Sequence, residues 1–328
     1  MLDTIKFVLK LPSLLFSDFC GFHKSSRSVG SLAILTYHRV LPVGDARRHG
    51  EEAGMIVSPE TLEKHIAWCQ EYGEIVRLKD WLSDPMGYRD RRCFAFTFDD
   101  GWVDNYEFAF PVLSGYGVPA TIFVVTDYID TRKCFWPGLV VKWLKDPARE
   151  MDHANPVHMA IARQFPKLVS VPYATVNQAS EVVAFLKNEF TDAELNEALA
   201  GSGETQDGDC LSNNQLQELY KSGLWDIGSH TATHCRLESR LDNATILDEL
   251  DRAKNWLDTR FPDAPFCFPN GSLSDNALDA VRARHLSAVT TETGWNDRLT
   301  DPYLLKRFHL HDGNSRSRLV FGRTIARP

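Results

Sequence analysis

Two short motifs carry residue types that could do hydrolytic chemistry. Residues 97–101 read Thr-Phe-Asp-Asp-Gly, so two adjacent carboxylates, Asp99 and Asp100, close an apolar run. Residues 229–234 read Ser-His-Thr-Ala-Thr-His and place His230 and His234 four positions apart after another apolar run. One carboxylate and two imidazoles are a common ligand set for a catalytic zinc ion, and the second carboxylate is then free to act as a general base.

Each motif has a simpler interpretation when it is taken alone. Asp and Gly are frequent turn formers, and a pair of histidines can be solvated or hydrogen-bonded to the backbone. Both motifs, however, directly follow apolar runs that read as strands, as catalytic residues on one rim of a parallel barrel do. The coincidence favours a metal site.

Side-chain alternation in residues 93–99 separates the two carboxylates. Phenylalanine occupies positions 94, 96 and 98, whereas small residues and Asp99 share the opposite face. If the small residues line a barrel, Asp99 points into its lumen. Asp100 must leave the strand geometry to join it, which the following Gly101 permits. We therefore expect different roles for the two carboxylates.

Apolar runs that alternate with helical patterns indicate an α/β protein. Seven runs read as strands: 31–38, 93–98, 120–126, 225–229, 266–269, 287–291 and 305–310. This order predicts an irregular seven-stranded (β/α) barrel, with a doubly wound open sheet as the alternative. The region of about 131–210 has no strand pattern and is interpreted as a helical insertion between the third and fourth strands.

Composition limits the domain organisation, the possible partners and the location of the protein. The chain has 328 residues, of which 43% are hydrophobic, enough for one barrel over 31–328. The net charge of −8, with scattered basic residues, excludes a nucleic-acid partner. Seven cysteines without C-x-x-C spacing favour a reducing, cytoplasmic location. Residues 1–30 are expected to form an amphipathic helix, either docked on the protein or in peripheral contact with a membrane.

The two motifs, in this order and spacing, resemble those of the NodB-type polysaccharide deacetylases, a carbohydrate esterase family that includes an exopolysaccharide and lipid-linked glycan branch. The resemblance implies that Asp99 is the general base and that Asp100, His230 and His234 hold a divalent metal. We expect zinc, with cobalt and nickel as alternatives. It also implies a distorted barrel.

Weaker motifs suggest further site residues. The Tyr-His pair that ends at His38 resembles an element of the exopolysaccharide branch, which implies a general acid; His309 and His311 are the rivals. Residues 266–271 resemble the family's third motif, but Cys267 stands where the family often has arginine. Arg307 on the last strand is the candidate replacement beside Asp99, unless it pairs with a structural carboxylate.

Three positions are candidates for substrate contact together with Arg307. Asn270, after Pro269, can offer its backbone N–H to an oxyanion or simply belong to a Pro-Asn-Gly turn. Trp295 can wall an acetyl pocket or be an ordinary packed aromatic.

These residues predict removal of N-acetyl groups from an amino sugar in a polysaccharide or lipid-linked glycan, so the expected partner is an N-acetylated glycan. The alternatives are O-deacetylation, hydrolysis of another amide, a glycan-binding protein without catalysis, and an interaction module. The sequence leaves the sugar and the oligomeric state open.

Overall fold

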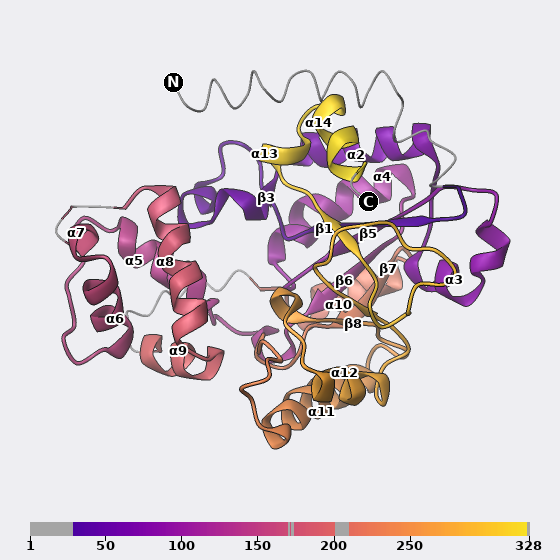
Figure 1. The fold of residues 1–328 in the computed structure, drawn as a ribbon. Helices are drawn as coiled ribbons and strands as arrows, with labels where there is room; N and C mark the ends of the chain where they lie inside the picture. Colours follow the sequence, from indigo (N-terminus) through magenta and orange to yellow (C-terminus); the bar gives the residue numbers. More distant parts are fainter. Residues whose placement is uncertain (1–28, 170, 172–173, 201–209, 327–328) are drawn as a thin grey trace.

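A parallel sheet forms the centre of the structure, a computed structural model that describes residues 29–169, 171, 174–200 and 210–326 (Figure 1). Its strands are joined in the order β10, β1, β5, β6, β7, β8, β9. Their bounds are β1 Leu32–Tyr37, β5 Cys93–Phe98, β6 Ala120–Val124, β7 Trp225–Ser229, β8 Phe266–Cys267, β9 Ala288–Val289 and β10 Arg307–His309. A parallel bridge between Val289 and Leu305 links the two ends of this row. The predicted irregular seven-stranded barrel is confirmed.

Three two-residue strands were not predicted. β4, Glu74–Ile75, pairs with the start of β5, and β2, Arg39–Val40, pairs with β3, Ile56–Val57. Runs this short carry no alternation from which a strand can be recognised.

The register between β1 and β5 brings the two predicted acid–base residues together. All six residues of each strand are buried, as expected for a parallel sheet covered on both faces. Tyr37 is the partner of Phe98, and the Asp99 N–H donates to the Tyr37 carbonyl at 2.9 Å. His38 and Asp99 therefore leave neighbouring strands at the same edge.

Helices surround the sheet (Figure 1). The bounds of the helices around the barrel are α2 Pro59–Tyr72, α3 Leu78–Ser83, α4 Phe110–Tyr116, α10 Asn213–Lys221, α11 Asn243–Asp258, α12 Asp275–Arg282, α13 Asp312–Ser315 and α14 Arg318–Ile325. Ser58 caps α2 by accepting the Thr61 N–H, and Pro59 occupies the first turn, where its missing N–H costs no hydrogen bond.

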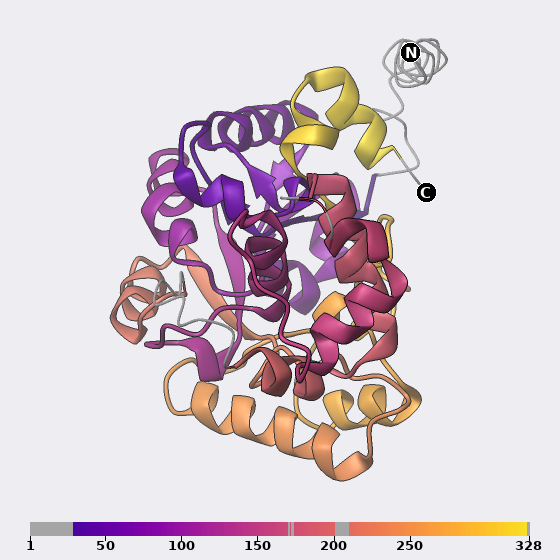
Figure 2. The ribbon, with the colours of Figure 1, turned by 90° about the vertical axis from the view of Figure 1, so that its left-hand side faces the viewer.

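The insertion between β6 and β7 is helical and stands beside the barrel in Figure 1 and in front of it in Figure 2. Its helices are α5 Trp136–Lys145, α6 Pro156–Gln164, α7 Pro166–Val169, α8 Val176–Glu189 and α9 Asp192–Leu199. They enclose their own apolar cluster, which includes Val140, Ile161, Val182 and Leu195. Because this core is separate from the barrel core, the insertion needs specific contacts to hold its position.

Those contacts centre on Asp192, which is buried at the start of α9. Its carboxylate accepts hydrogen bonds from the Arg236 side chain and backbone N–H and from Trp136 Nε1. Arg236 lies in the loop after β7. The insertion is thus fastened to the loop that carries the histidine motif.

None of the helices in the described part of the chain is long and apolar enough to cross a membrane. The expected amphipathic helix over 1–30 lies almost entirely outside the described residues.

Candidate active site

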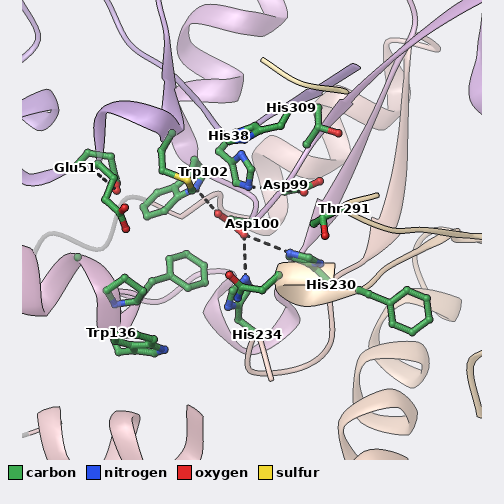
Figure 3. Close-up of a pocket in the computed structure, with 18 of the residues that line it drawn as sticks. His38, Glu51, Asp99, Asp100, Trp102, Trp136, His230, His234, Thr291 and His309 are labelled. Carbon is green, nitrogen blue, oxygen red and sulfur yellow. Dashed lines mark hydrogen bonds and ion pairs between the residues drawn. The ribbon is translucent and has the colours of Figure 1, made fainter. Parts of the chain in front are cut away.

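The carboxyl ends of β1, β5, β7 and β10 meet at a pocket of about 340 Å³ (Figure 3). Asp99, Asp100, His230 and His234 line its floor, as the sequence predicts for one rim of a parallel barrel. The start of the insertion forms one wall, and the loop after β8 contributes to another. The distant motifs are therefore brought into a single site.

Asp100 faces both histidines. Its Oδ1 lies 3.4 Å from Nε2 of His230 and 3.4 Å from Nε2 of His234 (Figure 3). The residue adopts the left-handed region with φ 73°, which turns the carboxylate out of the strand direction. Its Oδ2 accepts a 2.9 Å hydrogen bond from Trp102 Nε1. One carboxylate oxygen is held by Trp102 while the other is presented to the imidazoles.

This group of three fits a divalent metal. The ligand atoms lie within 4.8 Å of one another, and the buried Asp100 Oδ1 has no hydrogen-bond partner. Bonds of about 2.1 Å in a tetrahedral site put ligand atoms about 3.4 Å apart, which matches the two observed separations. His230 Nδ1 lies 2.8 Å from the Cys267 carbonyl, an outer hydrogen bond that leaves Nε2 available for an ion.

The loop after β7, which carries the two histidines, contains residues with strained backbone conformations. Thr231 and His234 both have φ 64°, a conformation that is costly for a β-branched residue. The buried Glu249 on α11 compensates by accepting the N–H groups of Ala232 and Thr233 at 3.1 and 2.9 Å. These hydrogen bonds stabilise a single conformation of the loop.

Asp99 has different partners from Asp100. Arg307 donates from Nη1 to Asp99 Oδ1 and from Nη2 to Oδ2, both at 2.8 Å. Burial alone would raise the pKa of the Asp99 carboxyl, but the charge and hydrogen bonds of Arg307, together with the nearby His38 and His230, hold that pKa below its usual value. The expected pairing of Arg307 with Asp99 is thus present. Its role in substrate binding stays a prediction.

Cys267 also touches this ion pair. Arg307 Nη2 donates to Cys267 Sγ at 3.2 Å, and that sulfur lies 3.7 Å from Asp99 Oδ2. Asp99, His230 and Cys267 form a second group close enough to hold a metal. Burial raises the pKa of the Cys267 thiol, and both Asp99 oxygens already accept from Arg307. The Asp100 group is the better fit, because its free carboxylate oxygen faces two imidazoles.

Of the three candidate acids, His38 lies next to Asp99. Its Nε2 is 3.8 Å from Asp99 Oδ2, and its Nδ1 is buried without a hydrogen-bond partner. Burial lowers the pKa of His38 despite the nearby carboxylates. His309 also lines the pocket, with its ring 5.0 Å from that of His38. His311 instead caps α13 by accepting the Gly313 N–H.

Two candidate substrate contacts need correction. The Trp295 ring packs against Phe94 and Phe308, and its Nε1 donates to the Ile325 carbonyl, so it does not line the pocket. Phe94 lies on the side of β5 that faces the helices. Because Trp295 packs against Phe94, it also lies outside the barrel. Pro269 is buried and likewise does not line the pocket.

Asn270 does line the pocket, with φ 54°, and its Oδ1 accepts a 2.8 Å hydrogen bond from Lys187 Nζ. Lys187, Glu51 and Trp102 are pocket residues that the sequence did not reveal. Trp102 directly follows the Asp-Asp-Gly motif, which could have drawn attention to it. Lys187 and Glu51 carry no such signal, because they reach the pocket only through the packing of the insertion and the β2–β3 loop.

Comparison with known proteins places the chain in a family. Residues 87–289 match the polysaccharide deacetylase family, which is more than half of the chain. The chain therefore belongs to the polysaccharide deacetylases, as the motifs predicted.

Relatives and solved structures agree with this assignment. The poly-β-1,6-N-acetyl-D-glucosamine N-deacetylase of Staphylococcus aureus is 20% identical over 237 residues, which cover 69% of this chain and 57% of the relative. YxkH of Bacillus subtilis is 34% identical over 98 residues, covering 29% of this chain and 32% of that protein. The chain thus spans less than two thirds of these relatives.

Solved structures of other deacetylases share the fold, and two of them illustrate the likeness. The Streptococcus pyogenes deacetylase PplD, in complex with acetate, has a TM-score of 0.58 at 18% identity and covers 91% of this chain and 99% of its own. IcaB from Ammonifex degensii has a TM-score of 0.56 at 16% identity, with coverages of 89% and 97%. At such identities the likeness concerns the fold alone.

Proposed function

From the family and the site geometry, we propose that the protein is a metal-dependent hydrolase that removes N-acetyl groups from amino sugars of a glycan. The observation that carries the proposal is the division of labour between adjacent carboxylates: Asp99 is held by Arg307, whereas Asp100 faces His230 and His234. The name of the Staphylococcus aureus relative supports an N-acetylated substrate.

Asp100, His230 and His234 would hold the metal, and their oxygen and nitrogen donors suit zinc. A divalent ion bound there supplies Lewis acidity, which lowers the pKa of water and polarises a carbonyl group. The Trp102 and Cys267 hydrogen bonds fix the carboxylate and the imidazole in the orientation that such an ion needs.

Asp99 acts as the general base. Its lowered pKa keeps the carboxylate ionised near neutral pH, so it can accept a proton from the water that attacks the acetamide carbon. The paired hydrogen bonds from Arg307 keep both carboxylate oxygens in place during this transfer.

His38 returns the proton to the departing amine, which is otherwise a poor leaving group. Burial keeps the resting imidazole neutral, so its proton must arrive during the reaction. The neighbouring group that carries a proton after the attack is Asp99, whose Oδ2 lies 3.8 Å from His38 Nε2. The backbone N–H of Asn270 at the pocket rim is the proposed donor to the oxyanion.

Acetate release tests the proposal. Purified protein with added zinc, cobalt or nickel should release acetate from β-1,6-linked N-acetylglucosamine oligosaccharides and leave free amines. Asp99→Asn should reduce the rate about 10²- to 10⁴-fold, whereas the matched control Asp90→Asn, at an exposed position, should not. Release from O-acetylated but not N-acetylated sugars would replace the proposal with O-deacetylation. Absence of release from both would refute it.

A further inference from the structure

The active-site pocket adjoins a second cavity of about 250 Å³. Four residues line both spaces: Glu51, Trp102, Phe135 and Gly138. In Figure 3, Glu51 and Trp102 lie on one side of Asp100, and Thr291 lies on the other. The second cavity therefore extends the pocket from the catalytic floor toward the insertion, on the side opposite the end of β9.

Helix α5 and the turn Ala46–Gly50 form two walls of this cavity. Lys145 of α5 donates from Nζ to the His49 carbonyl at 2.7 Å. The Lys142 side chain passes beside Gly50, where an added Cβ would lie 3.6 Å from Cε of the lysine. One wall belongs to the insertion and the other to the segment between β2 and β3. The cavity is therefore formed where these two parts of the chain meet.

The lining of the second cavity offers both donors and acceptors. Lys142 is exposed, and its ammonium group has no hydrogen-bond or ion-pair partner within the described part of the chain. Glu51 accepts the Glu52 N–H at 3.1 Å and a 3.4 Å hydrogen bond from Arg39 Nη1. A carboxylate has about four lone-pair sites, so Glu51 can accept further hydrogen bonds. Sugar hydroxyl groups both donate and accept, which suits this pair.

Gly138 stands at the junction of the two cavities without a side chain. It lies in the first turn of α5, its φ is outside the left-handed region, and an added Cβ would meet no heavy atom within 4 Å. Neither the backbone conformation nor close packing therefore requires glycine here. Because Gly138 lines both cavities, a larger side chain would occupy the space between them.

We infer that the second cavity is a subsite for the sugar next to the one that is deacetylated, with Lys142 and Glu51 as hydrogen-bonding partners of its hydroxyl groups. The inference rests on the proposed function for the identity of the reacting sugar. It deepens that function, because two adjoining subsites make an oligosaccharide or a polysaccharide the substrate in preference to a single sugar.

Oligosaccharides of defined length provide the test. β-1,6-linked N-acetylglucosamine chains of one to four units are treated with the metal-loaded protein, and acetate release is followed. We expect kcat/KM to be about tenfold higher for two units than for one, as two added hydrogen bonds of ordinary strength would give. Equal kcat/KM for one and two units would overturn the inference.

Gly138→Leu is designed to fill the junction. Leucine favours a helix more than glycine does, so we expect the variant to fold, which thermal unfolding checks. The variant should lose most of the advantage of two units over one. Gly115→Leu is the matched control, because Gly115 also has open space around an added Cβ but lies in α4 and lines neither cavity. A folded Gly138→Leu protein that keeps the full advantage contradicts the subsite.

Lys142→Ala tests the proposed hydrogen bond of the ammonium group. We expect the advantage of two units over one to fall several-fold. Lys167→Ala, at an exposed lysine of α7, is the matched control and should keep the wild-type ratio. An unchanged ratio in Lys142→Ala contradicts the part assigned to this lysine.

A binding series separates the subsite from the proposed reaction. Oligosaccharides of one and two units are titrated calorimetrically into chelator-treated wild-type protein and Gly138→Leu. The affinity should rise from one to two units in wild type only. If this difference is seen but no acetate is released, the reaction fails and the subsite stands. If acetate is released but one and two units bind and react alike, the subsite fails and the reaction stands.

Discussion

Asp99 and Arg307 form a two-pronged ion pair at the pocket floor, with both hydrogen bonds at 2.8 Å, although 208 residues separate them in the chain. Both are only 3% exposed. Cys267 fills the space beside the guanidinium, where a larger side chain would compete with it. The last strand, β10, thus supplies the cation that β8 lacks at position 267.

Arg307→Ala should raise the pKa of Asp99, because burial then acts without the opposing positive charge. The carboxylate would be protonated over a wider pH range, so the acidic limb of kcat/KM should move to higher pH. Loss of one partner of a buried pair should also lower the unfolding free energy by about 3–5 kcal/mol. Arg307→Lys, which keeps the charge, should shift the limb less. An unmoved acidic limb in a folded Arg307→Ala variant contradicts this role.

His38→Gln should lower kcat by about 10²- to 10⁴-fold, as expected for loss of a general acid, without loss of bound metal. His309→Gln is the matched comparison, because His309 lines the same pocket next to His38 but is exposed. A larger loss of kcat in His309→Gln would transfer the role of acid to that residue.

Asp192→Ala should loosen the insertion, because it removes the buried carboxylate that pairs with the buried Arg236 and leaves only the partly exposed Glu238 as a carboxylate partner. We expect a loss of about 3–5 kcal/mol in urea unfolding and faster proteolysis within the insertion helices. Glu197→Ala, at an exposed position on the same helix, is the control. Equal stability of the two variants would show that this ion pair does not fasten the insertion.

The unfolding free energy should fall between pH 6.5 and pH 4. Burial lowers the pKa of His65 and of His285 to about 4, so the unfolded chain binds more protons than the folded chain in this window. The expected loss is roughly 3 kcal/mol per histidine across the window. His285→Phe should flatten the dependence, and the exposed control His153→Gln should leave it unchanged. Equal pH slopes for His285→Phe and wild type would contradict it.

The sequence predicts those site residues that directly follow recognisable strands. The carboxylate and histidine motifs directly follow β5 and β7, and strand alternation alone predicts different roles for Asp99 and Asp100. For Arg307, the sequence leaves two interpretations open: it pairs either with Asp99 or with a structural carboxylate. Its pairing with Asp99 depends on β10 lying beside β1, a property of the closed sheet and not of local sequence.

Other features could not be predicted from the sequence, for physical reasons. Trp295 stands in a loop without periodicity, so nothing in the sequence shows which side of the barrel it faces. Lys187 belongs to a helix whose own core fixes its polar face, and its approach to Asn270 appears only when the insertion docks. The two-residue strand β4 depends entirely on β5 for its partner.

The central claim is that Asp100, His230 and His234 hold the metal while Asp99 handles protons. Metal content of Asp99→Asn and Asp100→Asn, measured by mass spectrometry after zinc loading and desalting, tests it most directly. We predict about one zinc per chain in wild type and Asp99→Asn, with acetate release lost in the latter, and little zinc in Asp100→Asn. Loss of zinc in Asp99→Asn with retention in Asp100→Asn would contradict the account and move the metal to the Asp99, His230 and Cys267 group.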